Sequence, residues 1–367
     1  MNEQVTVLIP AHNPGKYLQD ALNSVFIQLY DGWKIVLIDD GSDEEILAPD
    51  SEFLKDDRVE LIRLPQNLGQ SKALNIGLER VTTPYVIQLD SDDWFYPHTL
   101  DILVREAINQ PDNIGVISGN IHIVHENFEG KRMMTEVYKG QPFTDKYDFL
   151  LSNTSVWPRF YRTSALRSIG GWPTDDPYEG RVLEDKRILL RLIEKYDFLW
   201  VDYMLYNHRR HNNNQTNQIE LYAEMTEWTV RNALERWGGK YEPVFRTYGL
   251  GWKKIEQLIP NAIFSNDSND LNDHHVISAP EVPRFLQAPL NSIEKSSDSA
   301  PEAVINKEQP GTTPNAKLYT GPYMTLDTGL CMGPGTGPGT GPGTGPGTGP
   351  GTGPGTGPGT GPGTLGG

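Results

Sequence analysis

The chain contains the stretch Val86-Ile-Gln-Leu-Asp-Ser-Asp-Asp-Trp94, in which an apolar run of strand length stops at three acids. Carboxylates crowded at the end of a buried strand repel one another. A hard divalent cation with oxygen ligands relieves that repulsion, commonly together with a phosphate of the substrate. An acidic turn that ends the strand in solvent is the alternative interpretation, because Asp is common in turns.

Strands and helices alternate before this stretch. Residues 5–10 and 34–38 are β-branched apolar runs, and residues 59–64 form a weaker one. Apolar residues recur at helical spacing from 17 to 26, and a second helix is expected at residues 71–80. Such alternation favours a mostly parallel central sheet flanked by helices.

Three polar clusters follow the ends of these strands, at residues 10–13, 39–42 and 90–93. In open α/β sheets, ligands bind beyond the carboxyl ends of the strands. The sequence therefore predicts one binding site at one edge of the sheet. The turn at residues 10–15 is not the glycine-rich first turn of dinucleotide-binding folds, which argues against a dehydrogenase.

Five segments together resemble the motifs of family 2 glycosyltransferases, in that family's order and spacing. They are residues 5–13, 39–42, 67–77, 90–93 and 184–185, and the resemblance extends from residue 3 to residue 215. It implies the GT-A fold, the α/β fold of nucleotide-diphospho-sugar transferases, and an inverting transfer of a sugar.

The resemblance implies a site for the donor nucleotide. Asp40 takes the position that accepts a hydrogen bond from the imide nitrogen of uracil, for which a carboxylate is a natural partner. A turn acid that bonds its own backbone is the alternative. Lys72 is expected to reach the diphosphate, or else to lie on a solvated helix face. The residues expected to bind the nucleotide are Pro10, Ala11, Asn13, Asp40, Asn67, Gly69, Lys72 and Asp90.

A divalent metal, Mn²⁺ or Mg²⁺, is also implied. Asp92 is expected to be its direct ligand, with Asp90 closer to the ribose and Asp93 as a helper. The metal would bridge to the diphosphate and neutralise the charge that grows on the leaving group.

Residues 207–212 resemble the element that folds over the diphosphate in relatives. His211 is therefore a third candidate metal ligand beside Asp92 and Asp90. Arg209 or Arg210 is a candidate contact to phosphate oxygens. A basic strand end that makes surface ion pairs is the alternative interpretation.

Glu184 and Asp185 begin a predicted helix after a Gly-Gly-Trp segment at residues 170–172. The resemblance makes Asp185 the general base that takes the proton of an acceptor hydroxyl, and Glu184 the residue that orients it or contacts the acceptor. The alternative is structural, because acids in a first helical turn are favoured by the helix dipole.

Composition excludes some partners and compartments. The net charge of -16 at pH 7 argues against a nucleic acid or an anionic membrane as partner. Cys331 is the single cysteine, so no disulfide can form within the chain, and we expect a reducing compartment. No run reaches transmembrane length. A cytoplasmic protein, at most peripheral to a membrane, is expected.

The chain is expected to divide into four parts. Residues 1–215 form the catalytic domain, and residues 216–260 form a helical extension with helices at 218–237 and 252–258. Residues 261–332 are a low-complexity linker, and residues 333–367 a tail of Gly-Pro-Gly-Thr repeats; both are expected to be disordered, and nothing after residue 260 is expected to supply a packed face. The repeat threonines are candidate sugar acceptors, or the tail is a plain spacer.

The sequence thus predicts an inverting glycosyltransferase that uses a nucleotide-diphosphate donor, expected to be a UDP-sugar. The hydroxyl acceptor belongs to a glycan, a lipid-linked molecule or a protein, the chain's own tail included. Two alternatives remain open: a nucleotidyltransferase that makes sugar nucleotides, and a non-catalytic protein that binds or anchors them. The turn at residues 10–15 lacks the glycine-rich basic loop of the former. The set of acids at Asp40, Asp90, Asp92 and Asp185 counts against the latter.

Overall fold

A computed structural model describes residues 4–127, 129–211, 214, 218–261 and 276–280. By its contacts the chain divides into two units, residues 1–296 and 297–367, and the described residues all belong to the first. The α-helices are α1 (Leu18–Phe26), α2 (Gln70–Arg80), α3 (Thr99–Ile108), α4 (Lys146–Leu151), α5 (Thr163–Ser168), α6 (Glu184–Leu192) and α7 (Ile219–Arg236), with short 3-10 helices at Gly15–Tyr17 and Glu52–Lys55. The strands are β1 (Val5–Ala11), β2 (Trp33–Asp39), β3 (Val59–Arg63), β4 (Tyr85–Gln88), β5 (Trp94–Phe95), β6 (Ile114–Glu126), β7 (Arg132–Tyr138), β8 (Arg159–Arg162), β9 (Asp197–Arg210), β10 (Tyr241–Tyr248), β11 (Trp252–Pro260) and β12 (Ile277–Ser278).

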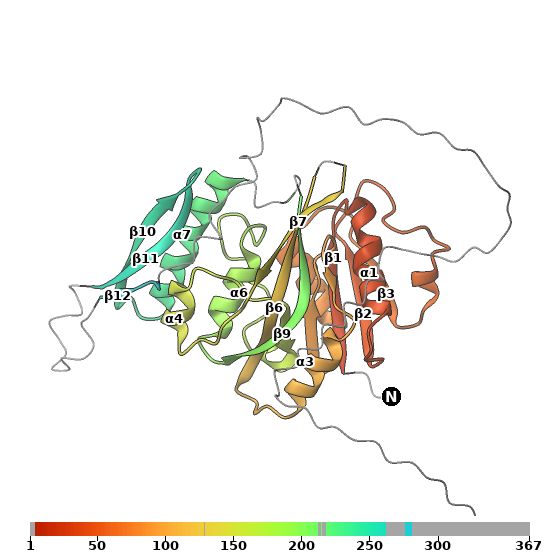
Figure 1. Cartoon of the computed structure of the whole chain (residues 1–367), viewed down its shortest axis with the longest axis horizontal. Coiled ribbons are helices and arrows are strands. Elements are labelled where there is room, and N and C mark those ends of the chain that lie inside the picture. Colours follow the sequence, from red (N-terminus) through yellow and green to blue (C-terminus); the bar gives the residue numbers. More distant parts are fainter. Residues whose placement is uncertain (1–3, 128, 212–213, 215–217, 262–275, 281–367) are drawn as a thin grey trace, which may run out of the picture. The chain divides into compact units, whose positions relative to one another are not determined.

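Nine of these strands form the central sheet in the described residues (Figure 1), in the order β3-β2-β1-β4-β8-β6-β9-β5, with β7 paired to β6. The first four in this order are parallel to one another, as the alternation of strands and helices predicts. Strand β8 runs antiparallel to both of its neighbours, β4 and β6. The fold is a mixed α/β fold, and the predicted GT-A architecture is confirmed.

The parallel register brings the strand ends together. Ala11 at the end of β1 pairs with Asp39 at the end of β2, and Leu8 pairs with Gln88 at the end of β4. The polar clusters after these strands therefore lie at one edge of the sheet, as expected from the sequence.

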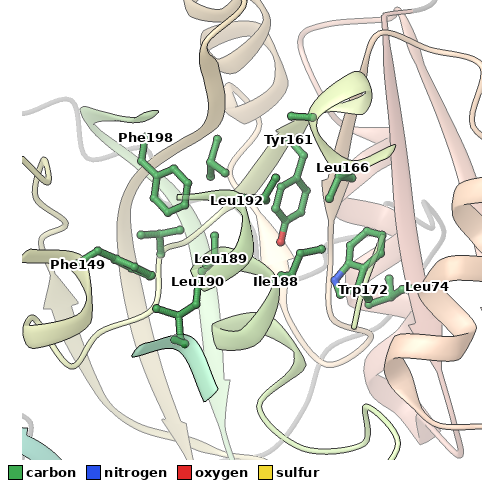
Figure 2. Packing of buried hydrophobic residues seen from close by; sticks show 14 of the residues in the cluster. Leu74, Phe149, Tyr161, Leu166, Trp172, Ile188, Leu189, Leu190, Leu192 and Phe198 are labelled. Atoms are coloured by element: carbon green, nitrogen blue, oxygen red, sulfur yellow. The ribbon is translucent and has the colours of Figure 1, made fainter. Parts of the chain in front are cut away.

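Each face of the sheet packs against its own set of helices. Leu8 of β1 belongs to a core with residues of α2, α6 and α7, whereas its neighbours Val7 and Ile9 belong to a core with residues of α1 and α3. Figure 2 shows part of the first core, in which Ile188 and Leu189 of α6 lie among buried aromatic residues. A strand that is buried on both faces explains why residues 5–10 are apolar apart from Thr6.

The C-terminal part of the described region differs from the prediction. A helix lies at Ile219–Arg236, as expected, but the helix expected at residues 252–258 is wrong. Those residues form β11, which pairs antiparallel with β10 and β12. Figure 1 shows this hairpin beside α7, and β11 contacts both α7 and α4.

The reason for the error is a β-bulge. Gln257 pairs with Val244 while Ile255 pairs with Phe245, so one extra residue, Glu256, sits in β11. Ile255 and Leu258 are both buried as a result, although residues three apart in a regular strand point to opposite faces. Their spacing of three imitates one turn of a helix.

The remaining domain boundaries stay predictions. Strand β12 lies inside the segment 261–332 that was expected to be a disordered linker, and Ile277 packs against the core that contains Leu258. The expectation that nothing after residue 260 supplies a packed face is therefore wrong. The repeat tail, residues 333–367, lies outside the described residues. No helix among the described residues has the length and apolar character that a membrane span requires.

Candidate active site

Asp40 lies directly after β2 and is 4% exposed. Its Oδ1 accepts the backbone N–H of Leu68 at 2.7 Å, and its Oδ2 accepts that of Gly69 at 2.8 Å. The carboxylate thus holds the loop that precedes α2 and not its own turn. Each carboxylate oxygen has a second lone pair, so Asp40 can still accept a hydrogen bond from a nucleobase.

The loop after β1 is fastened to the loop after β2. Asn13 donates from its side-chain amide to Asp43 at 2.9 Å and accepts the Asp43 backbone N–H at 3.0 Å. Its backbone N–H donates to Ser42 Oγ at 2.9 Å. Pro10 and Ala11 are buried within β1, so Asn13 is the residue of these three whose side chain reaches the surface.

The loop at residues 179–181 contacts three other predicted nucleotide-binding residues. Arg181 donates to the side-chain and backbone oxygens of Asn67, and Glu179 forms an ion pair with Lys72. Gly69 has a φ of 94°, and a Cβ there would lie 2.7 Å from Cγ of Arg181. Glycine at position 69 therefore permits both the backbone conformation and the close approach of Arg181.

Asp90 and Asp185 are brought together by a residue that sequence reasoning missed. Arg159 of β8 donates to Asp90 Oδ2 at 2.8 Å and to Asp185 Oδ2 at 3.4 Å. Its side chain is 3% exposed, whereas those of Asp90 and Asp185 are 24% and 20% exposed. The predicted ribose-side acid and the predicted base thus share one buried guanidinium and both remain open to solvent.

The Asp185 carboxylate has two further donors. Ser155 Oγ donates to Oδ2 at 2.9 Å, and the backbone N–H of Lys186 donates to Oδ1 at 2.7 Å. These bonds fix the carboxylate at the first turn of α6. The helix begins after Leu183, whose φ of 55° is unusual for a residue with a branched side chain.

Glu184 differs from Asp185 in its surroundings. It is 8% exposed, and burial, with a contribution from the Asp185 carboxylate, raises the pKa of Glu184 to about 8. Glu184 is therefore protonated at neutral pH and is able to donate a hydrogen bond. Two adjacent carboxyl groups with different environments suit two different roles.

Asp92 faces the other side of the acidic turn. Its Oδ2 lies 3.0 Å from Nε2 of His211, and the side chain is 29% exposed. The three predicted metal ligands do not form one cluster, because Asp90 is turned to Arg159. Within the described residues, no group of three or more His, Cys, Asp or Glu side chains is arranged to hold a metal ion.

Asp93 and Arg209 have structural partners. Asp93 accepts hydrogen bonds from Tyr206 at 2.8 Å and from the backbone N–H of Arg209 at 2.7 Å. The guanidinium of Arg209 is 3% exposed and pairs with Asp20 and Glu126. It also donates to the backbone oxygen of Asp92 at 2.7 Å. Arg209 thus lies in a buried network and not in a surface ion pair, and it supports the turn that carries Asp92. Its contact with a phosphate stays a prediction.

Comparisons with known proteins point to one family of enzymes. Residues 6–170 match the family model for glycosyl transferase family 2. Glycosyltransferase GlyA of Streptococcus pneumoniae serotype 4 is 29% identical over 190 residues, which is 51% of this chain and 26% of GlyA. Poly-beta-1,6-N-acetyl-D-glucosamine synthase of Staphylococcus epidermidis is 26% identical over 178 residues, which is 47% of this chain and 43% of that protein.

Solved structures show similar chain folds at low identity. Staphylococcus aureus TarS 1-349 in complex with UDP-GlcNAc has a TM-score of 0.48 and 18% identity, covering 63% of this chain and 66% of that one. Mannosyltransferase PcManGT from Pyrobaculum calidifontis, in complex with GDP-Man and Mn2+, has a TM-score of 0.45 and 15% identity, covering 64% and 65%.

The sheet order and the acids at its edge define a GT-A protein. Residues 6–170 place this part of the chain in glycosyltransferase family 2. The chain spans 26% of the length of GlyA and less than half of the length of the synthase.

Proposed function

We propose that this protein is an inverting glycosyltransferase that moves a sugar from a nucleotide-diphosphate donor, a UDP-sugar, to a hydroxyl acceptor. The observation that carries the proposal is the shared guanidinium of Arg159, which sets Asp90 on the donor side beside Asp185. Both acids are partly exposed, so a donor and an acceptor can meet between them.

The donor nucleotide is proposed to bind at the ends of β1 and β2. Asp40 is preorganised there by the backbone of Leu68 and Gly69, with its remaining lone pairs available for the imide N–H of uracil. Asn13 and Asn67 lie on the neighbouring loops and complete the proposed site.

The residues beside the proposed diphosphate fit a divalent cation. Mg²⁺ is usually held by one or two carboxylates, with substrate phosphates and water in the other positions, and imidazole is a ligand for first-row transition metals. Asp92 supplies the carboxylate, and His211, whose Nε2 lies 3.0 Å from Asp92 Oδ2, supplies the imidazole. When bound, Mn²⁺ or Mg²⁺ offsets the charge of the leaving diphosphate.

Asp185 is the proposed general base. The acceptor oxygen attacks the anomeric carbon and transfers its proton to Asp185, while the bond between that carbon and the donor phosphate breaks and its electron pair leaves with the diphosphate. A single displacement of this kind inverts the anomeric centre. Protonated Glu184 is proposed to donate a hydrogen bond to the acceptor.

The test is release of nucleoside diphosphate from a panel of sugar nucleotides with Mn²⁺. Asp185→Asn should lower transfer by about 10²–10⁴-fold, the usual contribution of a general base, and should leave donor affinity unchanged. The matched control is Asp112→Asn, because the Asp112 side chain is 100% exposed. Transfer by Asp185→Asn at the wild-type rate would contradict the assignment of the base.

The acceptor is proposed to be a hydroxyl group of a glycan, a lipid-linked molecule or a protein. Protein acceptors include the repeat threonines of the chain itself. Intact protein incubated with donor should then gain hexose-sized mass increments confined to residues 333–364. An unmodified tail after full donor turnover would exclude the repeat as acceptor.

A further inference from the structure

Arg159 joins two acids that come from separate elements. Its backbone pairs with Gln88 of β4, two residues before Asp90. Its Nη2 donates to Asp90 Oδ2 at 2.8 Å and its Nη1 to Asp185 Oδ2 at 3.4 Å. Asp90 follows the end of β4, and Asp185 lies in the first turn of α6. A single side chain on β8 thus spans from the donor side of the site to the base.

The charge of Arg159 is balanced by these two acids. Within the described residues, Asp90 and Asp185 are the acids at ion-pair distance from Arg159. The Arg159 Nε is buried and has no hydrogen-bond partner in that part of the chain. Loss of the guanidinium would leave Asp90 and Asp185 without their shared cation, and removing one member of a buried ion pair is strongly unfavourable.

We propose that Arg159 is a positioning residue that holds the Asp185 carboxylate in line with the donor side of the site by tying it to Asp90. The guanidinium is a planar, rigid fork, so its two Nη groups keep the carboxylates at a fixed separation and angle. The role rests on the proposed function, in which Asp185 is the base. In this role Arg159 touches neither donor nor acceptor.

The first test separates positioning from direct binding of the donor. Arg159→Met keeps the apolar stem and removes the fork. A carboxylate misplaced by ~1 Å should cost about 10²-fold in kcat. The KM for the donor should change by less than about threefold, because Gln88 and Gln70 also donate to Asp90 Oδ1 and keep this acid in place without Arg159. An Arg159 that bound a donor phosphate would show the opposite split, a raised KM with kcat retained, and that result would overturn the proposal.

Two more variants complete this test. Arg159→Lys keeps the positive charge but replaces the planar guanidinium by a single ammonium group. It should recover about tenfold of the lost kcat. Arg162→Met is the matched control on the same strand, since Arg162 donates to backbone oxygens of Gln110, Pro111 and Ile114. It should lower thermal stability without changing kcat. An equal fall of kcat in Arg162→Met would mean that any damage to β8 has this effect.

The second test needs no activity. Arg159→Met and Asp185→Asn should each lower the Tm, and the double variant should lose less than the sum, because both changes remove the same ion pair. Arg159→Gln replaces Arg159→Met in the cycle if the latter does not fold. Additive shifts would overturn the bridge whatever the enzyme does. If the shifts in Tm are non-additive but the wild-type protein releases no nucleotide from any donor, the bridge is confirmed and the proposed function is rejected.

Discussion

At the residue scale, two neighbouring carboxylates of the acidic turn have different partners. Asp90 faces Arg159, and Asp92 faces His211, although the two acids are separated by a single residue. A turn, unlike a continued strand, can send residues i and i+2 to different sides. The metal-binding role is therefore expected to belong to Asp92.

Asp92→Asn keeps the size of the side chain and removes its charge. We expect transfer to fall by about 10²–10³-fold, comparable to the loss of one electrostatic group at a transition state. Chelator should inactivate the wild type reversibly. Calorimetric titration with Mn²⁺ in the presence of UDP should show binding to the wild type and to the exposed control Asp50→Asn, but not to Asp92→Asn. Full activity in excess chelator would exclude the metal.

The pKa of Glu184 gives a prediction about stability. Its ordinary value is 4.5, and burial raises it to about 8 in the folded protein. Between these values the folded state binds more protons than the unfolded state, so stability falls as the pH rises. This loss is absent below pH 4.5 and complete above pH 8.

Glu184→Gln abolishes this titration. The Tm of the variant should therefore rise relative to the wild type between pH 5 and pH 8, by an amount that corresponds to a few kcal/mol at the upper end. Thermal melting across that pH range measures the difference. The control is Glu52→Gln, since the Glu52 side chain is 87% exposed. A constant difference in Tm across the range would show that Glu184 is ionised in the folded protein.

Sequence patterns identified some site residues and could not identify others. Asp40 and Asp185 stand in recognisable local contexts, a turn after a strand and the start of a helix. Arg159 does not, because its partners lie 69 and 26 residues away along the chain. Pairing of β8 between β4 and β6 creates the bridge, and that pairing is not encoded in the residues next to Arg159. The roles of Asp40, Asp92 and Asp185 stay predictions.

At the scale of elements, α2 is tied to the segment that precedes α6. The side-chain amide of Asn75 donates to the backbone oxygen of Trp172 and accepts its N–H, both at 2.8 Å. A Cβ at Gly171 would lie 2.3 Å from Asn75 Oδ1, so glycine is required for this approach. The Gly-Gly-Trp segment, which follows α5, therefore ties α2 to the chain after α5.

Asn75→Ala removes both bonds and leaves the backbone of Trp172 unpaired. We expect the free energy of unfolding to fall by about 1–3 kcal/mol, the cost of buried polar groups left without partners. Denaturant unfolding measures it, with Glu79→Ala on the exposed side of the same helix as control. An equal effect of both substitutions would show that helix propensity, and not the tie to Trp172, is responsible.

The wrong helix at residues 252–258 shows a limit of periodicity. Ile255 and Leu258 recur at a helical interval, but a single extra residue in β11 puts them on one face of a strand. Gly249 and Gly251 have positive φ angles and turn the chain between β10 and β11. These glycines were the local signal for a hairpin.

At the scale of the whole molecule, the core extends further along the chain than composition suggests. Ile277 and Ala279 pack against the core that contains Ile188 and Leu258. The N-terminal part of the sheet was predictable because β1, β2 and β4 are buried on both faces and the helices between them are amphipathic. The last strand was not, since two residues of β structure in a polar segment give no periodicity.

Truncation should reveal this boundary. A chain that ends at residue 280 keeps every described packing residue and should melt within about 2 °C of the full chain. A chain that ends at residue 260 lacks β12 and should melt at a lower temperature. Differential scanning calorimetry of the two truncated proteins makes the comparison. Equal melting of both would show that β12 contributes nothing to stability.

The buried network around Arg209 also constrains the order in which the protein becomes complete during synthesis. Asp20, Glu126 and the turn at Asp92 all leave the ribosome well before Arg209, whose guanidinium contacts each of them. Until Arg209 emerges, Asp20 and Glu126 lack the cation that they share. The parallel strands β1 to β4 can pair early, since nascent domains form from the N-terminal side. The proposed donor end of the site, although built mostly from the first 100 residues, is complete only when the end of β9 has been synthesised.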